Sequence, residues 1–458
     1  MENWNNKKVT VLGLGKSGLA SALYLKNRGA DVLVSEFSAE DKVPEDTKKA
    51  LANAGIPTEF GGHSDQAIDR SELFVISPGI PPSSAVVKRA RGTGCEVISD
   101  IELAYRELDV PIIAITGTNG KSTTTSLISY ILEKDGFSAP ACGNIGVPIL
   151  SLADRKLDFL VAEISSFQLE YAPTFAPDIS VWLNLTPDHL DWHPNLDHYI
   201  ETKRKMFSNQ KISQFAVLNH DDPIVITSTT VAEILPFSIM SEMNDQVQAV
   251  YVSDNFICCR RNMREYVLCH LSELGIRGAH NVENALAAVG ATILAGANPE
   301  TIDSCLKSFK ALEHRLEFVD TIDGIAFYND SKATNTVSAI KALEAFPQDK
   351  VVLIAGGKDK GTSLGDLIDV AKKRCAAVIL IGEATGRFQA EFNQHGIENI
   401  FPVATLEAAV KMGLELRLGP VVLSPACSSF DMFKNYEERG RVFKDIVRER
   451  GKEVAAGA

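Results

Sequence analysis

The chain has 458 residues, of which 45% are hydrophobic and 23% are charged, and its formal net charge is -13 at pH 7. This length predicts two to four domains, and the composition is that of a globular protein rather than a disordered or fibrous one. The acidic balance argues against a general nucleic-acid or anionic-membrane partner, because both require a basic surface.

The first stretch of the chain alternates β-branched runs with helical patterns, which is typical of a parallel α/β sheet. Its predicted strands are residues 8–14, 31–36 and 74–79. The loop GLGKSG at residues 13–18 follows the first strand and opens a helix, and Glu36 ends the next strand. These residues alone favour NAD, although the same loop fits a UDP group or a purely structural turn.

The second stretch continues the α/β pattern and contains a phosphate loop. Its predicted strands are residues 110–116, 158–163, 178–184 and 215–219, followed by a helix at 280–296. The loop GTNGKS joins the first of these strands to a helix at 123–134. Gly117 and Gly120 permit a tight turn that directs backbone N–H groups at a phosphate, Lys121 adds a positive charge, and Ser122 offers a hydroxyl to Mg²⁺.

The loop is shorter than a Walker A motif, which requires glycine where Ile115 stands. Glu163 ends a neighbouring apolar strand and resembles a Walker B acid. A glycine turn without a ligand and a solvated glutamate are the alternatives for these two features, and their occurrence together favours a nucleotide site.

The third stretch supplies predicted strands at residues 325–330, 350–357, 376–382 and 420–426. We therefore expect three α/β domains, each with a mostly parallel sheet flanked by helices. They are a Rossmann-like N-terminal domain at 1–108, a P-loop-type central ATPase domain at 109–311 and a Rossmann-like C-terminal domain at 312–458.

The remaining sequence features indicate a cytoplasmic protein. The eight cysteines are scattered, and a zinc site at Cys258, Cys259, Cys269 and His270 is disfavoured because the first two are adjacent. We expect no signal peptide and no membrane insertion, since the N-terminus has no apolar core and the run at 285–297 is too short to span a bilayer.

Several motifs in one order resemble the Mur ligases of bacterial peptidoglycan synthesis over essentially the whole chain. Besides GLGKSG and GTNGKS they are SPGI, GNIG, EISSFQLE, NLTPDHLD, AHNVENALAA, HR at 314–315, NDSKATN and SPACSSFDMFKNYEERG. Within that family the pattern is most similar to the enzymes that add D-glutamate to UDP-N-acetylmuramoyl-L-alanine.

The resemblance implies an ATP-dependent ligase that activates the acceptor carboxylate as an acyl phosphate, which the incoming amine attacks through a tetrahedral intermediate. The three domains would bind the UDP substrate, ATP and the amino acid in that order, and the site would form on domain closure. The implied partners are ATP, UDP-N-acetylmuramoyl-L-alanine and D-glutamate, with the chain acting as a monomer in the cytoplasm. Cell-wall synthesis, cell shape and cell division would depend on this step.

The resemblance also assigns individual residues. For ATP they are Gly117, Thr118, Asn119, Gly120, Lys121, Ser122, Thr123, Asn281, Asn284, His314, Arg315, Asp330 and Lys332. For the UDP substrate they are Gly15, Lys16, Ser17, Ser35, Glu36, Ser77, Pro78, Gly79, Asn144, Ser165 and Gln168. For the amino acid they are Thr334, Lys360, Ser429, Phe430 and Tyr436, the last a tyrosine where the family pattern suggests phenylalanine.

Two Mg²⁺ ions would be held by Ser122, Glu163, His189 and Lys203, and the catalytic group would be Lys121, Glu163, His189 and Lys203. Lys203 matches the family's lysine that reacts with CO₂, and the carbamate turns a cation into an anionic oxygen ligand. Lys205 is a nearby rival. Without the family, His189 and Lys203 would be interpreted as ordinary polar surface residues.

Two other functional classes explain less of the sequence. An NAD-dependent oxidoreductase does not explain GTNGKS or the third stretch. A non-catalytic nucleotide switch would be excluded by phosphate release that depends on both UDP-muramoyl-L-alanine and D-glutamate. Inside the family, ligases for other amino acids and folate polyglutamylation are further alternatives, and an amino-acid scan distinguishes them.

Overall fold

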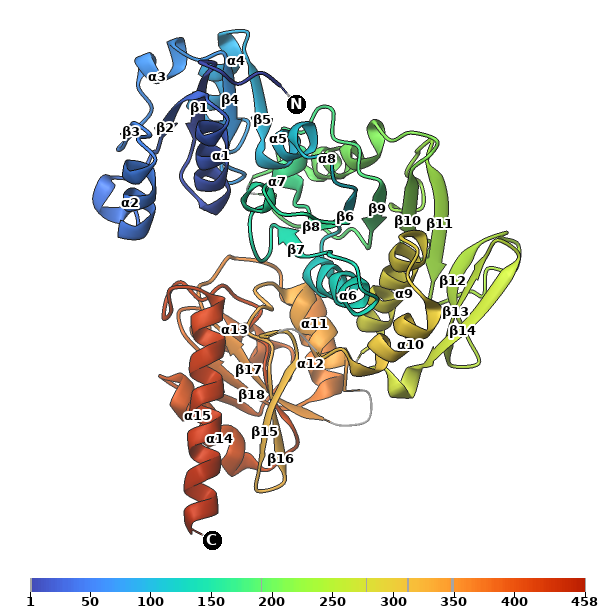
Figure 1. Cartoon of the computed structure of the whole chain (residues 1–458). Coiled ribbons are helices and arrows are strands. Elements are labelled where there is room, and N and C mark those ends of the chain that lie inside the picture. Colours follow the sequence, from blue (N-terminus) through green and yellow to red (C-terminus); the bar gives the residue numbers. More distant parts are fainter. Residues whose placement is uncertain (1, 191, 277, 311–312, 347–349, 458) are drawn as a thin grey trace. The chain divides into compact units, whose positions relative to one another are not determined.

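The computed structural model describes residues 2–190, 192–276, 278–310, 313–346 and 350–457 (Figure 1). The chain forms two compact units, Met1–Leu274 with Glu283–Ser308 and Gly275–Val282 with Phe309–Ala458. The first unit contains a five-stranded and a nine-stranded sheet, and the second contains a six-stranded sheet. The predicted boundary between residues 311 and 312 lies outside the described residues.

The N-terminal sheet is parallel and has the strand order β3-β2-β1-β4-β5. Its strands are β1 (Lys8–Leu12), β2 (Asp31–Ser35), β3 (Thr58–Glu59), β4 (Leu73–Ile76) and β5 (Glu96–Ser99). Its helices are α1 (Lys16–Asn27), α2 (Glu45–Asn53), α3 (Asp65–Asp69), α4 (Ala85–Gly92) and α5 (Asp100–Glu107), with a 3₁₀ turn η1 (Glu40–Lys42).

Both faces of this sheet are buried, as expected of parallel strands joined by helical crossovers. In β4, Val75 belongs to the same core cluster as Leu25 of α1. Its neighbours Phe74 and Ile76 belong to another cluster, with Val87 of α4. Successive side chains point to opposite faces of a strand, so helices cover the sheet on both sides.

The nine-stranded sheet has the order β14-β13-β12-β11-β10-β9-β6-β8-β7. Its strands are β6 (Ile112–Thr116), β7 (Ala141–Gly143), β8 (Leu160–Glu163), β9 (Ile179–Trp182), β10 (Phe215–Asn219), β11 (Glu233–Ser238), β12 (Ala249–Ser253), β13 (Phe256–Arg261) and β14 (Arg264–His270). Its helices are α6 (Lys121–Lys134), α7 (Ser166–Leu169), α8 (Leu196–Ser208), α9 (Ala279–Leu294) and α10 (Pro299–Ser308), with 3₁₀ turns η2 (Ile149–Leu152) and η3 (Leu271–Glu273).

Strands β12 to β14 form an antiparallel extension of this sheet that the sequence analysis does not predict. The turns at residues 254–255 and 262–263 have positive φ at both central positions, the conformation that two-residue hairpins favour. The Asp-Asn and Asn-Met pairs at these turns are the local signal that could have identified the hairpins. Cys258 and Cys259 are neighbours in β13, so their side chains face opposite sides of the sheet.

The six-stranded sheet of the second unit has the order β15-β16-β20-β17-β18-β19, and only β15 is antiparallel to its neighbour. Its strands are β15 (Glu317–Ile322), β16 (Ile325–Asn329), β17 (Val351–Gly356), β18 (Cys375–Ile381), β19 (Ile400–Pro402) and β20 (Val421–Leu423). Its helices are α11 (Thr336–Glu344), α12 (Gly365–Arg374), α13 (Thr385–Gln394), α14 (Leu406–Leu416) and the long α15 (Tyr436–Gly457), drawn in red in Figure 1.

Successive side chains of β17 also pack into two different core clusters of the C-terminal domain. Leu353 packs in a cluster with Leu367 of α12, whereas Ile354 packs in a cluster with Val410 of α14 and Phe443 of α15. All three sheets are mostly parallel with helices in their connections, which confirms the predicted fold class. Among the described residues no helix is both long and apolar enough to cross a bilayer.

Candidate functional site

The predicted phosphate loop lies between β6 and α6. Gly117 has a φ of 153° and Gly120 a φ of 85°, so both adopt backbone conformations that L side chains rarely take. A Cβ atom on Gly120 would lie 2.2 Å from Oδ1 of Asn284 on α9. Gly120 is therefore required both by its own backbone and by the helix packed against it. The backbone N–H groups at the start of α6 form the kind of cradle that binds phosphate.

The missing Walker glycine has a structural reason. Ile115 is a fully buried residue of β6, paired with Glu163 of β8 on one side and Val181 of β9 on the other. The strand therefore continues through the position where a Walker A loop has already begun. Asn184 holds the shorter loop, since its side chain accepts from the backbone N of Asn119 at 2.9 Å and donates to the carbonyl of Asn119 at 3.2 Å.

Two lysine side chains converge on this loop. Nζ of Lys121 donates to the carbonyls of Gly117 and Thr118, both at 2.9 Å. Nζ of Lys203 on α8 donates to the same Gly117 carbonyl at 3.0 Å and to the Thr116 hydroxyl at 3.3 Å. Only 1% of Lys203 is exposed to solvent.

The surroundings of Lys203 favour the neutral form of its amine. Burial lowers its pKa well below the ordinary value, and the charge of Lys121 lowers it further, against the opposing attraction of Asp188 and Glu163. A neutral amine is the nucleophilic form of lysine. By contrast, Nζ of the rival Lys205 lies 2.7 Å from a carboxylate oxygen of Glu170.

Glu163 is the last residue of β8 and lies at the same edge of the sheet. Its side chain is buried, and the amide of Asn144 donates to its Oε1 at 2.7 Å. The backbone N of Asn144 also donates to the Glu163 carbonyl at 2.9 Å. Ser122, at the start of α6, is buried as well. The structure thus gathers Lys121, Ser122, Glu163, Asn144 and Lys203 near the carboxyl ends of adjacent strands, where parallel sheets bind ligands.

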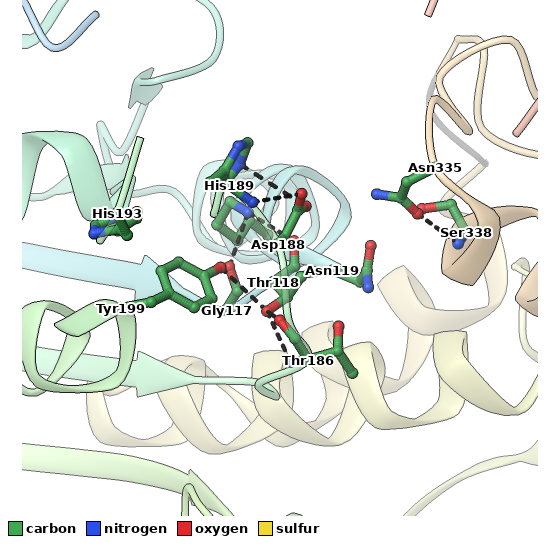
Figure 2. A network of polar contacts seen from close by, with 12 residues as sticks. Gly117, Thr118, Asn119, Thr186, Asp188, His189, His193, Tyr199, Asn335 and Ser338 are labelled. Atoms are coloured by element: carbon green, nitrogen blue, oxygen red, sulfur yellow. Dashed lines mark hydrogen bonds and ion pairs between the residues drawn. The ribbon is translucent and has the colours of Figure 1, made fainter. Parts of the chain in front are cut away.

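His189 lies on a neighbouring segment, with a φ of 56° and an exposed side chain. Asp188 accepts from its backbone N at 2.9 Å, as Figure 2 shows. The Thr118 hydroxyl donates to the Thr186 carbonyl at 3.0 Å and lies 3.2 Å from the Tyr199 hydroxyl, so the phosphate loop is tied to the histidine segment. The sequence analysis misses Asp188 and Tyr199, although Asp188 stands in the NLTPDHLD motif.

The oxygen donors fit a hard cation such as Mg²⁺, because Glu163 is a buried carboxylate whose orientation is fixed by Asn144. Among the residues that the structure describes, no three His, Cys, Asp or Glu side chains form a group that could hold a metal ion.

The predicted UDP-binding residues of the N-terminal domain follow three adjacent strands. Glu36 accepts from the backbone N of Leu14 at 2.6 Å and of Ser38 at 2.7 Å. Burial of Glu36 opposes its ionisation, but these hydrogen bonds outweigh burial and hold its pKa below the ordinary value. Gly15, Lys16 and Ser17 follow β1, Ser35 ends β2 and Glu36 follows it, and Ser77, Pro78 and Gly79 follow β4.

Ser165 and Gln168, predicted to bind the UDP substrate, lie at the start of α7. They form a capping box at the start of α7, and Nε2 of Gln168 donates to the carboxylate of Asp100 at 3.2 and 3.3 Å. Asp100 is fully buried, which raises its pKa, and it also accepts from Ser17 of the glycine loop. Asp100, which the sequence analysis misses, thus connects two of the predicted UDP-binding segments.

In the second unit the side chain of Asp330 forms hydrogen bonds within its own domain. Its carboxylate accepts from the Leu316 backbone N at 3.1 Å and the Ser424 hydroxyl at 2.7 Å. Burial raises its pKa to about 7. His314 Nδ1 lies 2.9 Å from the Asn329 amide. Asp330 and His314 therefore have partners inside this domain. Arg315, which follows His314, is half-buried.

Tyr436, a predicted amino-acid-binding residue, lies near two predicted ATP-binding residues of this unit. Nζ of Lys332 lies 5.5 Å from the centre of its ring, and the His314 ring lies 6.2 Å from it. Thr334 is half-buried, Lys360 is exposed, Ser429 is buried and Phe430 is 71% exposed. Of the two asparagines predicted to bind ATP, Asn281 belongs to the second unit and Asn284 to the first.

Three family models match the chain. They are described as "Mur ligase MurD-like, N-terminal domain" over residues 7–99, "Mur ligase middle domain" over residues 115–292 and "Mur ligase, glutamate ligase domain" over residues 314–427. Together they cover each of the three sheets.

Curated relatives match along nearly the full length. The UDP-N-acetylmuramoylalanine–D-glutamate ligase of Pelotomaculum thermopropionicum is 41% identical, with 98% of each chain covered. The protein of the same name from Koribacter versatilis is 42% identical, with 96% of this chain and 97% of the relative covered.

Solved structures share the fold at low sequence identity. The UDP-N-acetylmuramate–alanine ligase of Thermotoga maritima is 18% identical, with a TM-score of 0.60 over 96% of this chain and 99% of that one. A pseudomurein peptide ligase of Methanothermus fervidus is 19% identical, with a TM-score of 0.58 over 97% and 100%.

Proposed function

This chain belongs to the Mur ligase family, and we propose that it joins D-glutamate to UDP-N-acetylmuramoyl-L-alanine at the expense of ATP in peptidoglycan precursor synthesis. The observation that carries the ATP-dependent chemistry is the convergence of Lys121 and Lys203 on the Gly117 carbonyl beside the buried carboxylate of Glu163. The choice of D-glutamate is supported by relatives of that name that span nearly the whole chain.

The reaction requires activation of a carboxylate, which is a poor electrophile. Transfer of the γ-phosphoryl group of ATP to the acceptor carboxylate gives an acyl phosphate and ADP. The amine of D-glutamate then attacks the acyl carbon, and the tetrahedral intermediate expels phosphate to leave the amide. The protein's share of phosphoryl transfer is positioning and charge neutralisation, and the loop N–H groups and Lys121 supply both.

We propose that Ser122, Glu163, His189 and Lys203 hold magnesium, with Lys203 as its carbamate. Magnesium would neutralise charge on the phosphates during transfer. Attack of the unprotonated Lys203 amine on CO₂ would form a new N–C bond and release one proton, and burial and the charge of Lys121, which lower its pKa, favour that form. The resulting carbamate carries one negative charge and provides oxygen donors of the kind that magnesium prefers.

The other substrates would bind to residues at the carboxyl ends of the flanking sheets. We propose that residues 1–108 bind the UDP substrate through the segments after β1, β2 and β4, with Asn144, Ser165 and Gln168 contributing from 109–311. Residues 312–458 would bind the amino acid through Thr334, Lys360, Ser429, Phe430 and Tyr436. His314, Arg315, Asp330 and Lys332 would approach ATP from that domain, and Asn281 and Asn284 would face its adenine.

We also propose a cytoplasmic location, where ATP is available. The cysteines support it, because all eight are free thiols in the structure, as expected in a reducing compartment.

The decisive experiment measures phosphate release by the purified chain with Mg²⁺, ATP and UDP-N-acetylmuramoyl-L-alanine while the amino acid is varied. We expect release with D-glutamate and little with L-glutamate, L-alanine, L-lysine or diaminopimelate, and mass spectrometry should find the amide product. Equal release without any amino acid, or a preference for another amino acid, would overturn the proposal. A Lys121→Ala variant is the control for phosphate release by contaminating enzymes.

A further inference from the structure

Arg439 is a buried cation inside the C-terminal domain. It lies in the first turn of α15, and only 1% of its surface is exposed. Nε donates to the Ser331 hydroxyl at 2.9 Å and Nη2 to the Ser331 carbonyl at 2.8 Å. Nη1 and Nη2 both donate to the Cys427 carbonyl at 3.2 Å. Each nitrogen of the guanidinium is thus hydrogen-bonded, and Nη2 bonds to both loops.

A third loop packs against the same guanidinium. Gly357, which follows β17, has a φ of 135°, and a Cβ atom there would lie 3.2 Å from Nη1 of Arg439 and 2.4 Å from the Ser428 carbonyl. The backbone N of Lys358 donates to that Ser428 carbonyl at 2.8 Å. The Ser331 hydroxyl also donates to the Tyr436 carbonyl at 2.8 Å, which ties its loop to the start of α15.

The three loops follow adjacent strands of one sheet. Their strands β16, β20 and β17 are neighbours, so the loops leave the sheet side by side at its carboxyl edge. Ser331 precedes Lys332 and Thr334, Cys427 precedes Ser429 and Phe430, and Gly357 precedes Lys360. These are the residues proposed above to bind the amino acid, together with Lys332 for ATP.

The acceptors of Arg439 are unusual for a buried cation. Its hydrogen bonds in the described chain go to two backbone carbonyls and one hydroxyl, none of which carries a charge. Burial lowers the pKa of Arg439 to about 10, which leaves it charged at neutral pH. Burying a charge against neutral groups is costly, and the planar guanidinium, with five donors in a fixed fork, holds several acceptors that a lysine cannot hold at once.

From this convergence, and resting on the proposed function, we propose that Arg439 is a positioning residue that aligns the three loops for the incoming amino acid. Its guanidinium does not contact substrate. It fixes the spacing between the segments that carry Thr334, Lys360 and Ser429, so that the amino acid meets an already ordered site.

The test compares steady-state kinetics of Arg439→Lys and Arg439→Met with the unchanged chain, at saturating ATP. We expect the KM for D-glutamate to rise by about 10- to 100-fold, more for methionine than for lysine, because small displacements of positioning groups have effects of that size. The KM for UDP-N-acetylmuramoyl-L-alanine should stay within about twofold, since its proposed contacts lie in the first unit. Arg450→Met is the matched control on the same helix, where Arg450 pairs with Glu453 at the surface, and it should match the unchanged chain.

Thermal unfolding shows which variants fold. If Arg439→Met does not fold, Arg439→Lys alone provides the test. A D-glutamate KM within twofold of the unchanged chain in Arg439→Lys would overturn the positioning role. An equal rise of the KM for both substrates, or a lower kcat alone, would also overturn it, because a purely structural role predicts that result. If the unchanged chain itself shows no D-glutamate-dependent turnover, the proposed function fails and this inference falls with it.

Discussion

At the scale of single residues, Lys121 and Lys203 place their Nζ atoms on the same carbonyl, that of Gly117. Lys121 belongs to the helix that follows the loop, whereas Lys203 reaches the loop from α8 and is buried. Two positive charges so close together would repel each other, and burial adds to that cost. Burial and the charge of Lys121 therefore favour the neutral form of Lys203 by lowering its pKa. The proposed carbamate would replace the repulsion with attraction.

The prediction at this scale concerns Lys203→Ala. We expect turnover to fall by at least about 100-fold, the scale seen when a preorganised charge-stabilising group is removed, and added acetate or bicarbonate to restore part of it. Steady-state phosphate release measures both effects. Lys205→Ala is the matched control, two positions away on the same helix, and its turnover should stay within about threefold because its Nζ pairs with Glu170 rather than with the loop at Gly117. Full activity in Lys203→Ala would rule out the carbamate.

At the scale of elements, the phosphate site depends on how α9 packs against α6. Asn284 of α9 accepts from the Thr124 hydroxyl at 3.3 Å, and its Oδ1 occupies the space that a side chain on Gly120 would need. The helix α9 therefore supports the loop at the start of α6 directly. Its buried apolar face anchors it, with Leu286 and Val289 fully buried.

Gly120→Ala tests this arrangement. The new Cβ would clash with Asn284 and would also force alanine into a left-handed backbone, which costs roughly 1–2 kcal/mol by itself. We expect ATP binding, measured by titration calorimetry, to weaken by at least about 10-fold. Gly136→Ala separates the two effects, because Gly136 has a φ of 97° and no atom within 4 Å of an added Cβ. Gly136→Ala should lower the free energy of unfolding by a similar amount, but it should bind ATP with unchanged affinity. Equal ATP affinity in both variants would contradict the role of Asn284.

At the scale of the whole molecule, each of the two units has cores of its own. Val9, Trp182 and Met206 belong to one cluster of the first unit, and Phe327 and Phe443 to a cluster of the second. A ligand stabilises the unit that binds it by mass action, whereas a core substitution destabilises the unit that contains it. The units should therefore respond separately to such changes.

Differential scanning calorimetry can check this expectation. We expect two transitions, and UDP at about 100 times its dissociation constant should stabilise only the first unit, by about 2.7 kcal/mol. Phe443→Ala, at a fully buried position, should lower only the other transition, by the equivalent of about 3–5 kcal/mol. Val454→Ala on the exposed part of α15 is the control and should shift neither. A single transition that moves with both changes would contradict independent units.

The sequence by itself determined the three α/β sheets, the loop that carries Lys121 and Ser122, and the family, because local periodicity and contiguous motifs encode these features. It did not predict the hairpins from β12 to β14, whose two-residue turns are weak local signals. Tertiary structure alone separated buried Lys203 from ion-paired Lys205 and revealed that Asp100 connects Ser17 with Gln168. It also showed that Arg439 packs against three loops. Burial and hydrogen-bond partners arise between residues far apart in the chain, so they become defined only when the sheets have formed.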